Sequence, residues 1–276
     1  MLELLGAGEV RSLASELDLR PTKKLGQNFV IDPNTIRKIV AAANLEASDK
    51  VVEIGPGLGS LTLGLLEKVD QLVAIEFDEK LANRLVDTLK QKAPDKSCRI
   101  IHADAMTVTK LDMQPDALVA NLPYNISVPV ILHFLENFPS ISKVLVLVQA
   151  EVAARLVAGP GSKTYGSPSA KLAWYGKATA AGVVSRSIFW PVPNVDSALV
   201  YFEKRSIPLP THLRAEVFRV IDGAFAQRRK TLRQALAAWA GSPDLAEKIL
   251  VKAGVSPQAR GEDLGIDEFI EVAKLK

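Results

Sequence analysis

The chain contains 276 residues, of which 48% are hydrophobic and 24% charged, and its formal net charge is +3. These values are typical of a soluble globular protein with one large α/β core and a small second domain. No apolar run approaches a membrane span, and the first residues lack the basic start of a signal peptide. The single Cys98 excludes an internal disulfide, and the widely spaced His102, His133 and His212 show no ligand-like spacing. We therefore expect a cytoplasmic protein with no metal and no membrane partner, and a monomer by default.

The first 20 residues show weak helical periodicity, which predicts an N-terminal helix packed on the main body or a partly mobile arm. A loop-like stretch follows, with the basic pair Lys23 and Lys24 running into a glycine and two amides. Asp32 and Pro33 then predict a helix start, because Asp suits the N-cap and Pro the first turn. The apolar face of that helix is formed by Ile36, Ile39, Val40 and Ala43.

From residue 50 onwards, short apolar runs alternate with helical segments. Strands are predicted at 51–54, 72–76, 99–102, 117–121 and 144–149. Because such alternation forms βαβ units, we predict an α/β fold with a mostly parallel, doubly wound, Rossmann-like sheet.

The second half of the chain changes character. A turn cluster at 159–168 predicts an exposed, mobile loop, and two β-like runs at 178–185 and 197–204 predict an antiparallel edge. The prolines between these runs keep 189–197 extended. Further on the pattern is helical, with helices predicted at 211–238, 244–253 and 266–274. We expect a catalytic, cofactor-binding domain over 1–206, including an N-terminal helix or arm at 1–27, and a small all-α domain over 207–276 that contacts the polyanionic partner.

A glycine-rich turn, 55–59, joins the first strand of the alternating region to its helix, and such a turn lets a ligand approach the backbone closely. Glu76 ends the next strand, where a carboxylate can accept hydrogen bonds from both hydroxyls of a ribose. The pair fits either a dinucleotide or S-adenosylmethionine. S-adenosylmethionine is preferred, because the glycine spacing differs from the dinucleotide fingerprint and Glu53 could meet a cationic amino-acid group directly or through water. Asp104 could accept from an adenine amino group or cap a helix.

The stretch Asn121-Leu122-Pro123-Tyr124 follows an apolar run where a strand ends. Pro123 restricts the backbone, so the amide of Asn121 and the ring of Tyr124 are held in a fixed relation. An amide oxygen and an aromatic face suit an exocyclic amino group on a heteroaromatic base. The alternative is that Asn121 caps the next helix and Tyr124 packs in the core.

A basic cluster lies within 228–233, where Arg228, Arg229, Lys230 and Arg233 are predicted on one helix. Such a run is either a solvated face or a phosphate contact, and the basic pair at 23–24 beside a nucleotide pocket favours phosphate contact. Arg229 and Arg233 would share a helix face at i,i+4, and some of the cluster could instead brace the two domains.

Five segments, taken in order, resemble the small-subunit ribosomal RNA adenine-N6 dimethyltransferases. They are Lys24-Leu25-Gly26-Gln27-Asn28-Phe29, the Glu53–Gly59 turn, Asn121–Ser127, Phe189-x-Pro-x-Pro-x-Val195-Asp196-Ser197 and Phe225-x-x-Arg228-Arg229-Lys230. The resemblance extends from Lys23 to about Leu264 and implies a cytoplasmic enzyme. That enzyme would use S-adenosylmethionine to dimethylate two adjacent adenosines near the 3′ end of small-subunit rRNA, within an immature ribosomal subunit.

The resemblance also implies site residues. The family's cofactor contacts fall on Asn28, Val30, Gly55, Glu76, Asp104 and Asn121, and Val30 departs from the usual Leu. Asn121 and a backbone carbonyl near Leu122-Pro123 would accept hydrogen bonds from the adenine amino group, while Tyr124 stacks on the base. Phe189 would close the other face of the base, although on residues alone it could equally be a core aromatic.

Three other functions remain open at this point. The macrolide-resistance methyltransferases, which modify the large-subunit rRNA, are the nearest. A non-catalytic ribosome-assembly factor or transcription factor on the same fold is the second. A nicotinamide-dependent dehydrogenase is the third, and the sequence shows no hydride-transfer site for it.

Overall fold

The computed structural model describes residues 1–19, 28–123 and 126–276. Contacts divide the chain into two compact units, Met1–Ala153 with Thr179–Lys204 and Ala154–Ala178 with Arg205–Lys276. The segment 154–178 therefore groups with the C-terminal helices, whereas the predicted domains placed it in the first domain.

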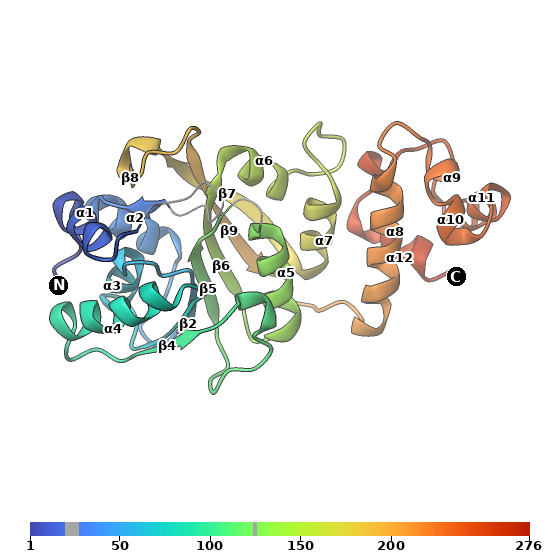
Figure 1. Cartoon of the computed structure of the whole chain (residues 1–276). Coiled ribbons are helices and arrows are strands. Elements are labelled where there is room, and N and C mark those ends of the chain that lie inside the picture. The colour runs from blue at the N-terminus through green and yellow to red at the C-terminus, as the bar shows by residue number, and fades with distance from the viewer. Residues whose placement is uncertain (20–27, 124–125) are drawn as a thin grey trace. The chain divides into compact units, whose positions relative to one another are not determined.

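The first unit is built on a seven-stranded sheet within the described residues, in the order β4-β3-β2-β5-β6-β9-β7 (Figure 1). The strands are β2 Lys50–Ile54, β3 Gln71–Glu76, β4 Cys98–His102, β5 Ala117–Asn121, β6 Lys143–Gln149, β7 Gly176–Val184 and β9 Ser197–Lys204. Neighbouring strands from β4 to β6 are parallel, and β9 pairs antiparallel with β6. These strands confirm the alternation predicted from the sequence.

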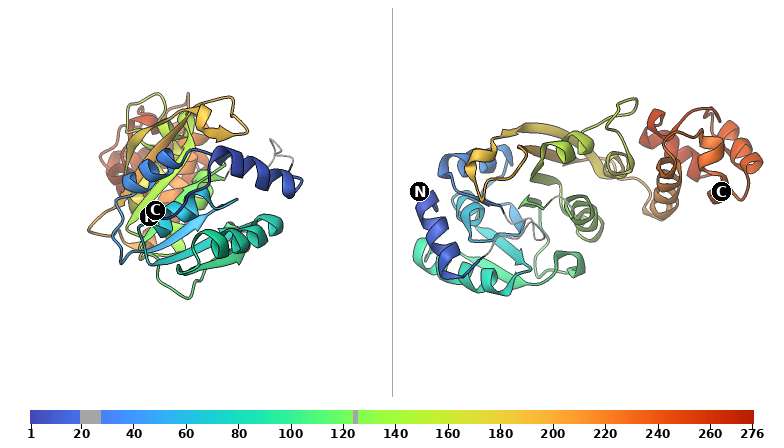
Figure 2. Two further views of the ribbon diagram at one scale, coloured as in Figure 1. Left: turned by 90° about the vertical axis from the view of Figure 1, so that its left-hand side faces the viewer. Right: turned by 45° about the horizontal axis from the view of Figure 1, so that its top comes forward.

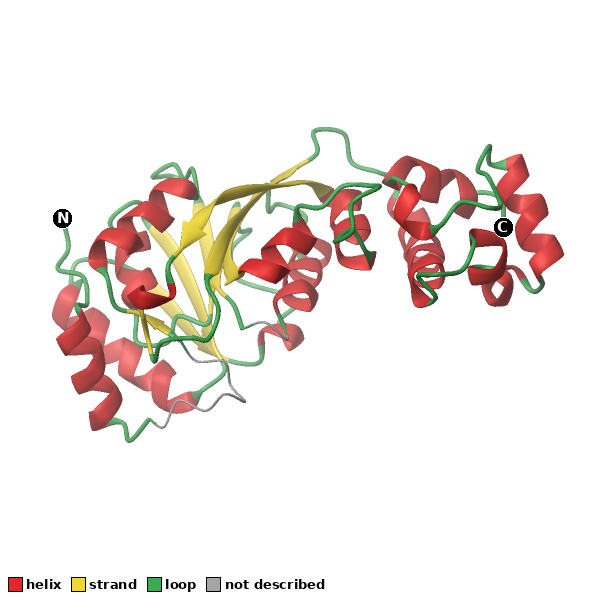
Figure 3. Ribbon diagram, turned by 90° about the horizontal axis from the view of Figure 1, so that it is seen from above, coloured by secondary structure: helices red, strands yellow, loops and turns green. Residues whose placement is uncertain are grey.

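Helices cover both faces of the sheet (Figure 3). The helices that follow the sheet strands are α3 Ser60–Leu66, α4 Glu79–Lys92, α5 Ser127–Asn137 and α6 Ala150–Leu156, with the short turn η1 Ala105–Thr107 after β4. Because both faces are covered, strands such as β5 and β6 are buried over nearly their whole length, which explains their continuous apolar sequence. The predicted helix start is confirmed in α2 Pro33–Ala42, where the Asp32 carboxylate accepts from the Thr35 N–H at 2.9 Å.

The N-terminal helix α1 Ala7–Glu16 packs on the first unit beside α4 (Figure 2). Val10 and Ala14 are fully buried, and Lys92 of α4 pairs with both Glu3 and Glu9, at 3.2 and 2.9 Å. Of the two possibilities raised by the sequence, the packed helix is therefore the one observed.

A second, two-stranded ribbon lies apart from the main sheet: β1 Phe29–Val30 pairs antiparallel with β8 Phe189–Trp190. The turn η2 Arg186–Ile188 precedes β8, and the Ile31 N–H donates to the Ile188 carbonyl at 2.9 Å, which extends the pairing. The prolines of 189–197 predict an extended segment here, but the sequence indicates no partner for it.

The second unit is helical. Its helices are α7 Ser167–Tyr175, α8 Arg214–Ala226, α9 Leu232–Ala235, α10 Ala237–Ala240, α11 Pro243–Lys252 and α12 Ile266–Ala273, with short turns η3 Thr211–Leu213 and η4 Gly261–Asp263. They enclose a core of their own around Val220, Ile221 and Phe269. The helices predicted at 244–253 and 266–274 are confirmed. No helix in the described part of the chain is long and apolar enough to cross a membrane.

The prediction of one helix over 211–238 is wrong. The chain leaves helical geometry after Ala226, and a turn separates α8 from α9. The N–H of Leu232 donates to the Ala259 carbonyl at 2.7 Å, and that of Arg233 to the Pro257 carbonyl at 3.1 Å. These bonds to a distant loop replace those that a continuous helix would make, so Arg229 and Arg233 do not share a helix face.

Candidate active site

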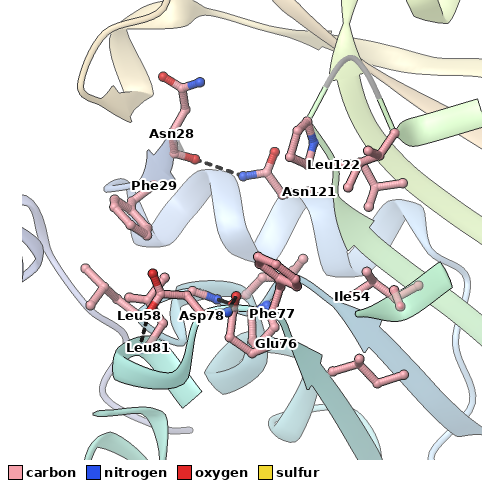
Figure 4. Close-up of a pocket in the computed structure, with 18 of the residues that line it drawn as sticks. Asn28, Phe29, Ile54, Leu58, Glu76, Phe77, Asp78, Leu81, Asn121 and Leu122 are labelled. Carbon is pink, nitrogen blue, oxygen red and sulfur yellow. Dashed lines mark hydrogen bonds between the residues drawn. The ribbon is translucent and has the colours of Figure 1, made fainter. Parts of the chain in front are cut away.

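A cavity of about 360 Å³ lies at the carboxyl ends of β2, β3, β4 and β5. From β2 the chain continues to β3 and β4 on one side of the sheet, and from β5 it continues to β6 on the other side. The cavity therefore lies at the topological switch point between β2 and β5. Asn28 and the two residues of β1, Phe29 and Val30, line one side of it. Figure 4 shows Asn28 and Asn121 on one side of this cavity and Glu76, Phe77 and Asp78 on the other.

The glycine-rich turn after β2 forms one wall of the cavity. Gly57 has φ +58, and a Cβ atom there would come within 2.9 Å of the Phe29 ring. Gly59 has φ +98, and its Cβ would meet Leu85 at 2.7 Å. Only glycine combines that backbone conformation with that space, so the turn packs closely against Phe29 and Leu85.

Glu76 ends β3 with its side chain buried next to this turn. Its two oxygens accept from the backbone N–H groups of Gly57 and Asp78, each at 3.0 Å. Burial raises the pKa of Glu76, and the N–H donors of Asp78, Gly57 and Phe77 oppose that rise. Each carboxylate oxygen can accept a further hydrogen bond, so both hydroxyls of a ribose could be held here.

Glu53 precedes the turn on β2 and is only 1% exposed. Within the described residues neither of its oxygens has a hydrogen-bond partner of good geometry, and its side chain does not line the cavity. Burial raises the pKa of Glu53 to about 8, the Thr62 hydroxyl offsets part of the rise, and the charge of Glu76 adds to it. Glu53 is therefore mostly a neutral acid at pH 7, and its contact with a cofactor stays a prediction.

The part of the cavity at the ends of β3 and β4 is lined by Phe77, Ala103, Asp104 and Ala105. One oxygen of Asp104 accepts from the Met106 N–H at 2.9 Å and caps η1, which is the alternative role considered from the sequence, while the same carboxylate borders the cavity. Phe77, which was not predicted from the sequence, lines the cavity and is 64% exposed. An aromatic residue directly after an acid at a strand end was the signal that could have found it.

Asn121 is the last residue of β5, and its side-chain Nδ2 donates to the Asn28 carbonyl at 3.0 Å (Figure 4). That bond fixes the side-chain amide by its nitrogen, so Oδ1 is the atom left to accept from a ligand. Gly55 lies beside Asn121, since a Cβ on Gly55 would be 3.9 Å from the Asn121 carbonyl oxygen. The glycine-rich turn therefore lies next to Asn121, the predicted catalytic residue.

Leu122 and Pro123 continue the wall beyond Asn121. The Leu122 N–H donates to the Leu147 carbonyl at 3.1 Å, and the Pro123 carbonyl accepts from the Ile126 N–H at 3.3 Å. Because the Pro123 carbonyl is engaged in this turn, the Leu122 carbonyl is the better candidate to accept from a substrate. Tyr124 lies outside the described residues.

Phe189 belongs to β8 and is only 2% exposed. It is absent from the residues that line the cavity and packs in the core of the first unit. The described structure thus holds Phe189 as a core aromatic, one of its two expected roles, and contact with a base would require the ring to become accessible.

The basic residues of the second unit have different surroundings. Arg228 donates to the carbonyls of Lys163 and Tyr165, at 2.7 and 3.2 Å, so it braces the 159–168 loop within its own unit. Arg233 pairs with Glu247 and Asp244, each at 2.7 Å. The hydrogen bond to Glu247 is the main cause that raises the pKa of Arg233, and Asp244 adds to it. Arg229 and Lys230 are exposed. Lys23 and Lys24 lie outside the described residues.

The residues present at the cavity fit S-adenosylmethionine: a glycine-rich turn whose backbone lines the cavity, a buried acid for a ribose and an aromatic edge for an adenine. Among the described side chains, no group of three or more His, Cys, Asp or Glu is placed to hold a metal ion. The fold and the site together define a Rossmann-like S-adenosylmethionine-dependent methyltransferase.

Comparison with known proteins makes the assignment narrower. A model of the family described as ribosomal RNA adenine dimethylase matches residues 19–276, and the chain belongs to this family. Ribosomal RNA small subunit methyltransferase A of Streptomyces coelicolor is 57% identical over 277 residues, which cover 99% of this chain and 97% of the relative. The protein of the same name from Arthrobacter sp. is 56% identical over 275 residues, covering 99% of this chain and 93% of the relative.

Solved structures agree. A dimethyladenosine transferase from Plasmodium falciparum superimposes with a TM-score of 0.72 at 22% identity, covering 87% of this chain and 94% of that one, which supports the fold. The 23S rRNA methyltransferase ErmE gives a TM-score of 0.67 at 25% identity, covering 90% of this chain and 99% of that one. The predicted fold class, family and enzyme class are confirmed: the chain is an rRNA adenine dimethyltransferase.

Proposed function

We propose that this enzyme transfers methyl groups from S-adenosylmethionine to the N6 amino groups of two adjacent adenosines near the 3′ end of small-subunit rRNA, within an immature ribosomal subunit. The observation that carries the chemistry is the Asn121 amide, anchored by Nδ2 to the Asn28 carbonyl beside the glycine turn. The small subunit is favoured because the relatives at 56 and 57% identity carry that substrate in their names, whereas the 23S enzyme is 25% identical.

The chemical difficulty lies in the adenine amino group, whose lone pair is delocalised into the ring. S-adenosylmethionine, when bound, supplies an electrophilic methyl group that a nitrogen lone pair can displace from sulfur. Asn121 Oδ1 and the Leu122 carbonyl accept hydrogen bonds from the two amino protons, which favours a pyramidal nitrogen with its lone pair directed at the methyl carbon. The nitrogen becomes acidic as the C–N bond forms and then loses a proton to water, so no strong base is required.

Cofactor binding rests on the other side of the cavity. Glu76 accepts from the ribose hydroxyls, Asp104 and the Phe77 ring hold the adenine, and Gly55 and Val30 approach the ligand closely. Asn28 contributes from β1. The target base would be stacked by Tyr124, and by Phe189 if that ring becomes accessible, which would repay part of the cost of unstacking it from the RNA.

Contacts with the RNA backbone are assigned to Lys23 and Lys24 and to the exposed Arg229 and Lys230. Arg228 and Arg233 have protein partners, the 163–165 carbonyls and two carboxylates respectively. Their contribution to binding would therefore be mainly to hold the turn that presents Arg229 and Lys230.

Methyl transfer from labelled cofactor to immature small and large ribosomal subunits, offered separately, tests this proposal. Dimethyladenosine on the small subunit alone, identified by mass spectrometry, is the expected result. Label on the large subunit would move the substrate to that of the resistance enzymes. Cofactor binding with no label on either subunit would favour a non-catalytic assembly factor.

A further inference from the structure

The β1–β8 ribbon lies between the glycine-rich turn, which Phe29 of β1 contacts, and the 186–196 loop, which contains β8. Phe29 pairs with Trp190 and Val30 with Phe189, and no other strand extends this ribbon among the described residues. Two strands of this length are marginal without support from side chains. What holds the ribbon in place is therefore informative about its role.

The support comes from two aromatic rings. Phe29 and Trp190 stack with their centroids 6.4 Å apart and their planes 20° from parallel, which is a favourable offset geometry. The Phe29 ring also lies against Gly57, where a Cβ would be only 2.9 Å away. Phe29 thus contacts both Trp190 on the partner strand and the glycine-rich turn that follows β2.

The residue before Phe29 orients the predicted catalytic amide. The carbonyl of Asn28 accepts from Asn121 Nδ2 at 3.0 Å, and this carbonyl belongs to the peptide that joins Asn28 to Phe29. A change in the position of Phe29 therefore moves that carbonyl directly. Without the bond, the amide could rotate and exchange its oxygen for its nitrogen at the cavity.

The Trp190 side of the ribbon is also anchored. Arg186 donates its backbone N–H to Asp196 Oδ1 at 3.1 Å and its Nη1 to the Asn194 carbonyl at 3.2 Å. These bonds close the 186–196 loop on itself. Trp190 is thus presented from a braced loop.

We propose that Trp190 is a positioning residue for methyl transfer: by stacking on Phe29 it fixes the Asn28 carbonyl and so keeps Asn121 Oδ1 directed at the substrate amino group. The inference rests on the proposed function only for the role of Oδ1. The link between Trp190 and the Asn121 amide is a property of the protein alone.

The experiment compares Trp190→Ala with Trp190→Phe, and with Val192→Ala as a control at a 60% exposed position of the same loop. Two quantities are measured: kcat and KM for the RNA, and the hydrogen-exchange rate of the Asn121 side-chain amide, followed by NMR on asparagine-labelled protein. In Trp190→Ala we expect that exchange rate to rise at least tenfold and kcat to fall at least tenfold, with the KM for RNA changed less than threefold. Trp190→Phe should restore both to within threefold, and Val192→Ala should change neither.

Unchanged exchange at Asn121 in a folded Trp190→Ala protein would overturn the proposal, and so would faster exchange with an unchanged kcat. If Trp190→Ala does not fold, Phe29→Leu removes the same stack from the other strand and is judged by the same two criteria. The exchange measurement needs no RNA, so it decides the link to Asn121 even if small-subunit rRNA proves not to be the substrate.

Discussion

Replacing Glu53 by glutamine should make the protein more stable at neutral and alkaline pH. The Glu53 carboxyl lies inside the sheet with no hydrogen-bond partner of good geometry in the described structure, beside the negative charge of Glu76. Glutamine has nearly the same shape and never ionises. The substitution therefore removes the cost of protonating this acid on folding at any pH above its ordinary pKa, while keeping the packing.

The magnitude follows from the pKa. In the unfolded chain Glu53 ionises near 4.5, whereas in the folded protein it keeps its proton up to about pH 8. Because the folded state binds this proton more tightly, the free energy of unfolding falls as the pH rises from 4.5 to about 8 and then levels off. Each pKa unit is worth about 1.4 kcal/mol, so the loss is at most about 5 kcal/mol.

Urea unfolding from about pH 5 to about pH 9, on the wild type and on Glu53→Gln, measures this effect. We expect the two curves to lie close together at the acidic end and to diverge as the pH rises, with the variant more stable. Glu79→Gln, at an exposed position of α4, is the matched control and should follow the wild type. Parallel curves for the wild type and Glu53→Gln across the range would refute a proton held by Glu53 in the folded state.

Further predictions concern the site and the RNA contacts. Asn121→Ala should abolish methyl transfer and leave the cofactor Kd within about tenfold, or ~1.4 kcal/mol, by calorimetry; retained transfer would contradict its role. Gly57→Ala should weaken cofactor binding by at least about tenfold, because a methyl group there would displace the Phe29 ring, which lines the cavity, and should also lower stability by about 1–2 kcal/mol through backbone strain at φ +58; unchanged calorimetric affinity would argue against that role of the turn. Reversing Lys23, Lys24 and Arg229 to Glu should weaken RNA binding and flatten its salt dependence in a filter-binding titration, and an unaltered slope would speak against phosphate contact.

The sheet could be predicted from the sequence because its information is local. A strand covered on both faces, such as β6, must be apolar along its length, and the turns between such strands carry glycine and capping residues. For the same reason the glycine turn, Glu76 and Asn121 could be located at one edge of the sheet before their contacts were known. The carboxyl ends of parallel strands meet there whatever the details of packing.

The features that the sequence did not predict depend on partners far along the chain. The β1–β8 ribbon has two residues in each strand, too few for any periodicity, and it joins segments about 160 residues apart. In the sequence Arg233 is predicted as a cation available to RNA, because its partners Asp244 and Glu247 come from α11 further along the chain. The break after Ala226 likewise results from backbone bonds to 257–259, which no local pattern announces.

The strand order has a consequence for how the chain is made. β9 is the last strand to be synthesised, yet it lies between β6 and β7 in the finished sheet. A nascent chain that has not yet reached Ser197 therefore exposes the hydrogen-bonding edge of β6, whose interior residues are all apolar. Until that stretch emerges from the ribosome, this apolar edge is open to pairing with other chains, and nascent chains of increasing length should become protease-resistant only once β9 is available.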